Sequence, residues 1–458
     1  MEGHTKKVYV GIDWGTHSSK WAADVVTEEN DDIFLTNIIS SDLLIDAGKI
    51  TMAPPDSHLP DIERISSFKR YIIKDPYTPF WACRDDINMS MGSGVVFSIC
   101  TLLGNFIAEL TERELISVVN STEIEVGFSF PNWLKENDSG SRTAARNYHE
   151  AIVISCCLFK IWTDNLPNPG ELYSVKEWEE LISKIRKDIV FPADSRVSIG
   201  DMTTTEYEPY DFSIGENDNK LKWRYLVESC AAGLPYLRSI ELKTPPGVPG
   251  LGKLLIIDIG AGSTDIGYML RTISIKDGSE NLFYFPPAAT LPIAGNVLTE
   301  AIKDFNDSIG RSITFKEAEN YKITMTSEWI NKDFAERWKK DICKHIKDYI
   351  KNSPDRRWLD VNMPLEIIIT GGSAVIEGLS TEVRKTVNKG LKERGLQSDV
   401  ADNVEIISDN IFAKVFRIKD DYARMAVAIG SADKDKPSLK YLSEMSPPTR
   451  IDSGVVKY

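Results

Sequence analysis

The feature that most constrains the fold is a device that occurs twice: an apolar strand ending in an aspartate, a glycine turn and a second strand. Residues 8–18 read VYVGIDWGTHS, and residues 254–267 read LLIIDIGAGSTDIG. Asp13 and Asp258 are 258 − 13 = 245 residues apart. Each apolar run is too short for a helix and is bounded by glycine, which predicts a strand–turn–strand unit. A third apolar run at 365–370 leads into Gly371-Gly372-Ser373.

Helical patterns separate these strands, and strands that alternate with helices are typical of an α/β protein. Apolar residues recur near helical spacing in 62–73, 141–159, 175–189, 295–305, 328–350 and 376–391. A Pro/Gly cluster at 244–250 precedes the second copy of the device and indicates a boundary between two halves. We therefore expect mixed sheets flanked by helices in two lobes.

Composition excludes several classes of function. The chain of 458 residues has a net charge of −14 and is 42% hydrophobic, so it is typical of a soluble globular protein without attraction for nucleic acid or anionic lipid. Six cysteines without a CxxC pair, beside five histidines, disfavour a structural zinc site. We expect no export signal and no stretch reaching the roughly 18 to 20 apolar residues of a membrane span. The sequence thus predicts a cytoplasmic protein with no membrane contact.

The aspartate–glycine–hydroxyl loops suit a metal-bound polyphosphate. Glycine lets backbone N–H groups approach phosphate oxygens, a Thr or Ser hydroxyl donates a further hydrogen bond, and the carboxylate holds Mg²⁺ or its waters. Because Asp-Gly turns are also common in hairpins, one loop alone leaves a purely structural role open. Two such loops and a third glycine pair favour phosphate clamping beside a site for a flat nucleoside.

These three loops resemble those of the actin-like ATPase superfamily. Asp13-Trp14-Gly15-Thr16 is similar to its first phosphate loop, residues 258–265 to its second, and residues 369–373 to its adenosine loop. The resemblance implies a two-lobed, ribonuclease H-like fold with nucleotide in the cleft between the lobes. It also implies ATP or ADP and Mg²⁺ as cofactors.

Within that superfamily the chain most resembles the ATPase domain of the seventy-kilodalton heat-shock chaperones. The strand–proline–helix segment at 128–131, the helix at 228–236, the adenosine-contacting helix at 318–322 and the closing helix at 426–432 are similar to theirs. Lys69 stands where those chaperones carry their catalytic lysine. Two plainer interpretations stay open: Lys69 as a solvated lysine, and Glu228 as a carboxylate favoured by a helix dipole.

The resemblance assigns roles to the site residues. Lys69 would stabilise charge at the γ-phosphate or orient the attacking water, Glu228 and Asp265 would position metal waters and nucleophile, and Asp13 and Asp258 would hold Mg²⁺ through water. The residues implied in nucleotide binding are Gly15, Thr16, His17, Gly260, Ala261, Gly262, Ser263, Thr264, Gly295, Glu319, Lys322, Gly371, Gly372 and Ser373.

The chain departs from the family pattern at several positions. His17 replaces a phosphate-binding threonine, and Ala261 replaces a glycine, where a Cβ would crowd the phosphate. Val375 and Ile323 replace basic residues that contact adenosine, so base recognition is expected to be weaker or altered. No peptide-binding domain is expected after Asp433.

Relative to the family, the first half is expected to contain an inserted segment at about residues 161–219. Its aromatic residues either offer a surface to a protein partner or form a small core of their own. They are Trp162, Trp178, Tyr207, Tyr210 and Phe212.

The expected domains follow from these assignments. The first lobe is 1–250, with core 7–40, 115–250 and 412–433 and a subdomain at 41–114. The second lobe is 251–411, with core 251–293 and 360–411 and a subdomain at 294–359. Residues 434–458 are expected to form an irregular tail.

We expect slow hydrolysis of Mg-ATP that drives a change between conformations in a chaperone-like protein. Two alternatives stay open: an actin-like filament or segregation ATPase, and a nucleotide-binding scaffold without turnover. The oligomeric state is not predicted.

Overall fold

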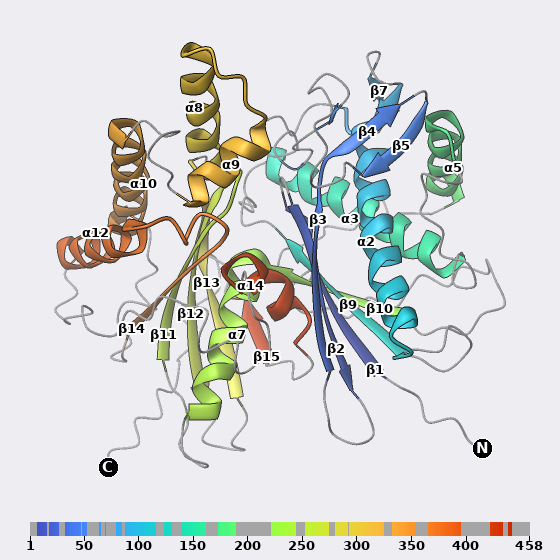
Figure 1. The fold of residues 1–458 in the computed structure, drawn as a ribbon. Helices are drawn as coiled ribbons and strands as arrows, with labels where there is room; N and C mark the ends of the chain where they lie inside the picture. The colour runs from blue at the N-terminus through green and yellow to red at the C-terminus, as the bar shows by residue number, and fades with distance from the viewer. Residues whose placement is uncertain are drawn as a thin grey trace. The chain divides into compact units, whose positions relative to one another are not determined.

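The structure is a computed structural model, and it describes residues 7–15, 18–26, 33–46, 48–52, 64–65, 69, 79–84, 88–115, 123–130, 139–161, 173–188, 221–243, 252–273, 280–291, 293–324, 332–352, 365–394, 422–433 and 438–441. The chain divides into two compact units. Unit 1 comprises Met1–Ser129, Leu134–Leu226 and Ser431–Lys434. Unit 2 comprises Phe130–Trp133, Val227–Gly430 and Asp435–Tyr458. Both combine mixed sheets with helices, so the chain is an α/β protein as predicted (Figure 1).

Unit 1 is organised around a five-stranded sheet with the order β10-β9-β1-β2-β3. The predicted hairpin is present, because β1 pairs antiparallel with β2. On its other side β1 pairs parallel with β9. The strands are β1 (Lys7–Asp13), β2 (Ser18–Val26), β3 (Ile33–Ser40), β9 (Glu123–Phe130) and β10 (Leu221–Val227).

Smaller strands and three helices complete the described part of unit 1. A three-stranded sheet has the order β5-β4-β6, and β7 pairs with β8. The strands are β4 (Leu43–Asp46), β5 (Lys49–Met52), β6 (Arg64–Ile65), β7 (Cys83–Arg84) and β8 (Met89–Ser90), and the helices are α2 (Met91–Glu112), α3 (Ser139–Ile161) and α5 (Val175–Asp188). Since β6 lies inside 62–73, the helix predicted there is wrong at Arg64–Ile65, where the backbone pairs with Leu43 and Leu44 of β4.

Helix α2 corrects the expectation about apolar stretches. Among the described residues it is the one helix long and apolar enough to cross a membrane, with a mean hydropathy of 1.7 over its best window. Small polar residues interrupt its apolar run, so its sequence contains no unbroken apolar stretch of membrane-spanning length. Its window is 78% buried inside the protein, and Ser90 caps its first turn by accepting a hydrogen bond from the Ser93 amide at 3.1 Å.

Helix α5, within the inserted segment, packs onto α2. Trp178 is fully buried, its ring lies edge-on to Phe97 at 5.5 Å between centroids, and its indole N–H donates to the Ser93 carbonyl at 3.0 Å. This aromatic residue therefore belongs to the core of unit 1. The other four predicted aromatics, Trp162, Tyr207, Tyr210 and Phe212, lie outside the described residues.

Unit 2 repeats the strand arrangement of unit 1. Its sheet has the order β14-β11-β12-β13-β15, and β11 pairs antiparallel with β12 and parallel with β14. The series β14-β11-β12-β13 thus matches β9-β1-β2-β3 in order and direction. The strands are β11 (Gly252–Ile259), β12 (Thr264–Ile273), β13 (Glu280–Leu291), β14 (Leu365–Thr370) and β15 (Ser438–Tyr441).

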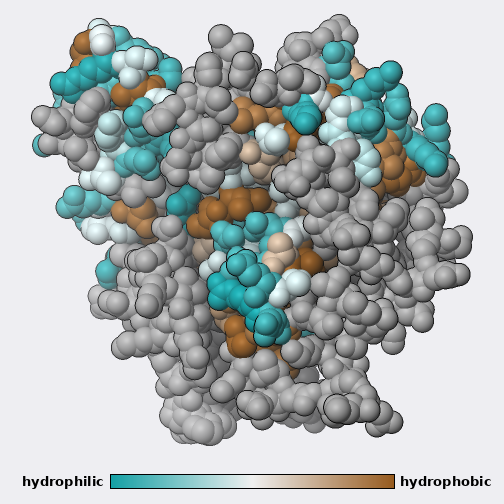
Figure 2. All heavy atoms as spheres, turned by 45° about the vertical axis from the view of Figure 1, so that its right-hand side comes forward, coloured by the Kyte–Doolittle hydropathy of each residue, from teal (hydrophilic) through white to brown (hydrophobic). Residues whose placement is uncertain are grey.

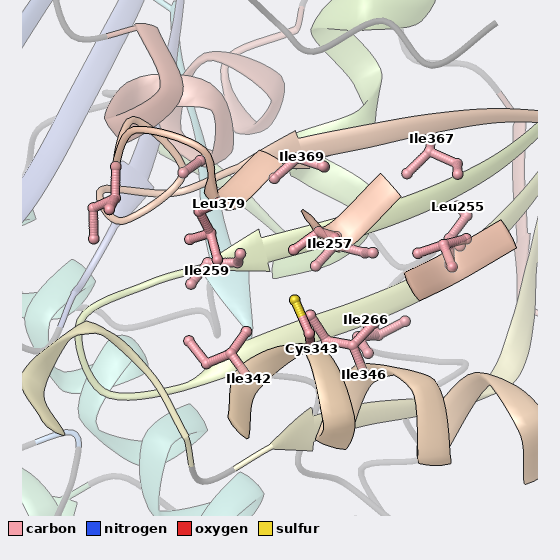
Figure 3. Close-up of a cluster of buried hydrophobic side chains, with 14 of the residues drawn as sticks. Leu255, Ile257, Ile259, Ile266, Ile342, Cys343, Ile346, Ile367, Ile369 and Leu379 are labelled. Atoms are coloured by element: carbon pink, nitrogen blue, oxygen red, sulfur yellow. The ribbon is translucent and has the colours of Figure 1, made fainter. Parts of the chain in front are cut away.

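Helices cover both faces of this sheet. Side chains alternate between the two faces along a strand, so neighbouring residues of β11 pack against different helices. Leu255, Ile257 and Ile259 of β11 belong to the hydrophobic core that includes Ile342 and Ile346 of α10 (Lys332–Asn352), as Figure 3 shows. The neighbouring Ile256 points to the other face, where α7 packs on the sheet. The remaining helices of unit 2 are α7 (Glu228–Lys243), α8 (Gly295–Ser308), α9 (Phe315–Thr324), α12 (Leu379–Glu393) and α14 (Tyr422–Ser431).

Helix α7 belongs to unit 2 by its contacts, whereas the predicted first lobe continues to residue 250. A Cβ on Gly233 would lie 3.0 Å from Cδ1 of Ile256 in β11, and one on Gly430 in α14 would clash with the Ala231 carbonyl. The small residues of α7 and α14 therefore permit close packing of helix on sheet and of helix on helix.

The tail after residue 433 also differs from expectation. Ser438–Tyr441 forms β15 and pairs parallel with Asn281–Tyr284 of β13. The prediction of an irregular segment is wrong for these four residues, because the sheet edge at β13 supplies hydrogen-bonding partners that no local pattern in the segment indicates.

Candidate functional site

The first loop places Asp13 at the end of β1, directly opposite Lys20 of β2 in the hairpin register. The Lys20 amine donates to Oδ2 of Asp13 at 2.6 Å, and the Ser129 hydroxyl lies 3.4 Å from Oδ1. Both charged side chains are largely buried, with 14% of Lys20 and 7% of Asp13 exposed. Asp13 is therefore an ion-paired carboxylate at the end of the strand.

The two described residues that follow Asp13, Trp14 and Gly15, both make close contacts. Trp14 is buried and stacks on Tyr148 at 5.6 Å between centroids. A Cβ on Gly15 would clash with the Ser18 carbonyl, so only glycine fits there. Thr16 and His17, the other predicted phosphate contacts of this loop, lie outside the described residues.

Two further predicted catalytic residues are buried, each in its own unit. Lys69 in unit 1 is 6% exposed, which contradicts the plain interpretation of a solvated lysine. Glu228 is the first residue of α7 in unit 2 and is 4% exposed. Its position agrees with the favourable interaction between a carboxylate and a helix N-terminus.

The second loop, in unit 2, is closed by a hydrogen bond from the Gly260 amide to the Ser263 carbonyl at 2.9 Å. Asp258 lies opposite Asp265 in the register of β11 and β12. The Asp265 carboxylate accepts from the Ser263 hydroxyl at 2.9 Å and from the Thr290 hydroxyl at 2.6 Å. Two hydroxyl donors thus fix the orientation of Asp265.

Thr264 and Ser263 use their hydroxyls within the protein. Thr264 is fully buried and donates to the Ile293 carbonyl at 2.6 Å, while Ser263 donates to Asp265. A phosphate contact through either hydroxyl requires an exchange of these partners.

The third loop lies directly against the second. The Ser373 amide donates to the Ile259 carbonyl at 3.0 Å, and its hydroxyl donates to the Gly260 carbonyl at 3.2 Å. Gly371 has a φ of +93°, and a Cβ there would clash with Oδ1 of Asp258. The glycine is required both by its backbone conformation and by its neighbour.

Helix α8 begins at the same place. The Gly295 amide donates to the Gly260 carbonyl at 3.1 Å, and the Asn296 amide donates to the Ala261 carbonyl at 2.8 Å. A Cβ on Gly295 would clash with the Ser373 hydroxyl and lie 3.0 Å from Nζ of Lys322. The second loop, the third loop, α8 and α9 therefore converge around Gly295.

Lys322 of α9 is a buried cation at this convergence. It is 2% exposed, and its Nζ lies 3.6 Å from Oε1 of Glu319. Burial lowers the pKa of Lys322 from its ordinary value, the Glu319 carboxylate raises it, and the charge of Arg424 lowers it again. The structure thus brings together the predicted nucleotide contacts of unit 2, namely Gly260, Ala261, Gly262, Ser263, Thr264, Gly295, Glu319, Lys322, Gly371, Gly372 and Ser373.

Sequence reasoning missed three polar neighbours of the loops: Lys20, Thr290 and Arg424. Lys20 lies seven positions after Asp13 and comes opposite it through the hairpin register, which depends on the length of the turn. Thr290 and Arg424 come from β13 and α14, and no local spacing connects them with the loops.

No group of three or more His, Cys, Asp or Glu side chains able to hold a metal ion occurs among the residues that the structure describes. The prediction for Asp13 and Asp258 is a contact through water, which needs no such group. All six cysteines are free thiols. The chain matches no protein-family model, and no curated protein is significantly similar to it.

Proposed function

We propose that this chain binds a magnesium-bound nucleoside triphosphate, ATP by its resemblance, and hydrolyses it slowly as a nucleotide-driven conformational switch related to the actin-like, heat-shock-type ATPases. The observation that carries the proposal is the repeated sheet β9-β1-β2-β3 and β14-β11-β12-β13. In each copy an aspartate lies at the end of the first strand of the hairpin or one residue before it, and a glycine stands two residues after the aspartate. Such repetition of fold and loop chemistry favours a polyphosphate ligand over two unrelated hairpin turns.

The proposed chemistry uses positioning and charge neutralisation. Asp13 and Asp258 hold the Mg²⁺ waters, Lys69 stabilises charge at the γ-phosphate, and Glu228 and Asp265 orient the nucleophile. The hydroxyls that fix Asp265 and the burial of Lys69 support these roles, because preorganised groups in water-poor surroundings stabilise developing charge best. A protein partner at the inserted segment and a cytoplasmic location complete the proposal.

The test is Mg-ATP hydrolysis and equilibrium ATP binding over a wide range of protein concentration, for the parent, Lys69→Ala and Asp258→Asn. We expect a slow rate per molecule that is independent of concentration and falls at least about 100-fold in both variants, as for loss of a charge-stabilising group. Lys303→Ala, which removes a partly exposed α8 lysine paired with Asp307, is the matched control.

Two other results identify the alternatives. A rate that appears only above a threshold concentration indicates a filament-forming ATPase. Binding of ATP without turnover in the parent indicates a scaffold and removes the catalytic roles. Absence of any nucleotide binding refutes the proposed function.

A further inference from the structure

The solvent-facing side of α10 carries a stripe of lysines. Four of them follow one another at intervals of three or four residues, so they lie on one side of the helix. They are Lys340, Lys344, Lys347 and Lys351. Lys347 is half-buried and the other three are exposed. With 351 − 340 = 11 residues between its ends, the stripe is about 16 Å long.

A second stripe of lysines lies on α12. Lys385, Lys389 and Lys392 are exposed and follow the same helical spacing. This helix packs against α10, and Figure 1 shows the two side by side. The contact is close, because a Cβ on Gly390 would lie 3.3 Å from Cγ2 of Ile350 in α10. The stripes thus belong to two helices that are in direct contact.

Glu393, the last residue of α12, joins the two stripes. Its carboxylate pairs with Lys347 at 2.7 Å and with Lys351 at 3.4 Å. The hydrogen bond from Lys347 holds the pKa of Glu393 below its ordinary value. Lys389 lies one turn before Glu393, on the same side of α12. The lysines of both helices therefore form one continuous surface, which we call the α10–α12 face.

This face is basic in an acidic chain. Helix α10 carries seven Lys and Arg against four Asp and Glu, and α12 carries four against two, whereas the whole chain has a net charge of −14. Lys340, Lys344 and Lys389 have no ion-pair partner among the residues that the structure describes. Because like charges one turn apart destabilise a helix, such stripes favour a ligand of opposite charge.

Apolar surface does not accompany these lysines. Among the described residues, the exposed large apolar side chains are Val297, Ile309 and Val375, and none of them belongs to α10 or α12. On the face of the molecule that Figure 2 shows, hydrophobic and hydrophilic residues are interspersed. Helices that lie on a membrane combine basic residues with apolar side chains that enter the acyl boundary. The α10–α12 face lacks the apolar part and does not fit a lipid surface.

Aromatic side chains that could stack on nucleic-acid bases are not exposed on this face either. Phe334, Trp338 and Tyr349 of α10 are buried or half-buried, and α12 has no aromatic residue. Single-stranded nucleic acid is held largely by such stacking. A long duplex would also extend beyond the lysines, toward a chain whose net charge of −14 repels phosphates. A short acidic segment of a protein, by contrast, contacts the lysines alone.

We propose that the α10–α12 face is a docking surface for a protein partner, which it binds through an acidic helix whose carboxylates repeat about one turn apart. The spacing follows from the lysines, which repeat by one turn along α10 and α12. None of these lysines belongs to the candidate nucleotide site or to the inserted segment. The inference therefore goes beyond the proposed function and does not depend on it.

The experiment measures the dissociation constant of the full chain for a synthetic helical peptide with glutamates at positions i, i+4, i+7 and i+11. We expect saturable binding at about 50 mM salt that weakens several-fold at about 200 mM, because the contacts are between exposed charges. The variant Lys340→Glu/Lys344→Glu should weaken binding at least tenfold, since it replaces attraction by repulsion. A peptide of the same composition with glutamates on all sides should bind at least about threefold more weakly, because fewer carboxylates then reach the lysines together.

The matched control is Lys184→Glu/Lys187→Glu, which makes the same change in net charge at two exposed lysines of α5. It should leave the dissociation constant within about twofold of the parent value, since these lysines lie outside the α10–α12 face. The neutral variant Lys340→Gln/Lys344→Gln should show an intermediate loss, and it keeps the test valid if the glutamates disturb folding.

Three results would overturn the inference. The first is no saturable binding of the peptide at low salt, and the second is an equal loss in the α5 control. The third is tighter binding of an oligonucleotide or of anionic vesicles than of the peptide, which would assign the face to a nucleic acid or to a membrane. Each of these results leaves the proposed nucleotide-binding function unchanged.

Discussion

Replacing Gly371 by alanine tests the geometry of the third loop, with Gly372→Ala as its matched control one residue away. Gly371 has a φ of +93°, whereas Gly372 is outside the left-handed region. An alanine in left-handed conformation costs about 1–2 kcal/mol. The added Cβ would also clash with the Asp258 carboxylate and the Ile259 carbonyl, and such overpacking costs about 1–3 kcal/mol. We therefore expect Gly371→Ala to lower the free energy of unfolding of unit 2 by about 2–5 kcal/mol.

Gly372→Ala should have little effect, because the nearest atom to its Cβ is Arg424 Cγ at 3.7 Å, an ordinary van der Waals distance. The change expected for a compatible glycine replacement is within about 1 kcal/mol. Urea unfolding followed by tryptophan fluorescence measures both variants, since Trp338 is buried in the core of unit 2. Equal unfolding midpoints for the two variants would refute the reasoning that Asp258 and the third loop are in direct contact.

Two predictions concern unit 1. Lys20→Met should destabilise the protein by about 3–5 kcal/mol, because it leaves the Asp13 carboxylate buried without the lysine amine that pairs with it. In thermal unfolding, the double variant Lys20→Met/Asp13→Asn should recover most of this loss of stability. A double variant as unstable as Lys20→Met would contradict this reasoning. Burial lowers the pKa of His149 to about 4, and its Nδ1 lies 2.7 Å from the Tyr225 hydroxyl. Because the unfolded chain binds the proton with an ordinary pKa near 6.5, the stability that neutral His149 provides is complete above that pH and is lost as the pH falls toward 4, up to about 3 kcal/mol. His149→Gln should flatten the dependence of the urea midpoint on pH between 6.5 and 4, and an unchanged profile would exclude His149 as its source.

The sequence predicted the elements whose pattern is local. The hairpins at Asp13 and Asp258 follow from short apolar runs that end at glycine, and the helix predicted at 175–189 is α5 at Val175–Asp188. Helix α2 was missed because serine, threonine and glycine dilute an apolar run that no charged residue interrupts before Glu109. Strand β15 depends on the open edge of β13, which is distant in sequence.

The candidate site also has a part that the sequence predicts and a part that it does not. Backbone loops and their glycines are visible in the sequence because tight turns restrict residue type. Their polar neighbours are not, because Thr290 and Arg424 reach the loops through tertiary packing. Lys20 is intermediate, since strand register brings it to Asp13 but register cannot be known before the turn length is fixed.

Register also shows that the two copies of the device differ in charge. Residues directly opposite in an antiparallel pair have neighbouring side chains, and opposite charges attract there while like charges repel. In unit 1, Asp13 faces Lys20, so the pair is neutral; in unit 2, Asp258 faces Asp265, so the pair carries two negative charges when both are ionised. A cation lowers the repulsion of the second pair and competes with the lysine amine at the first. If Mg²⁺ binds as proposed, its hydration shell should therefore depend more on Asp258 than on Asp13, although the two aspartates occupy equivalent places in the repeated sheet.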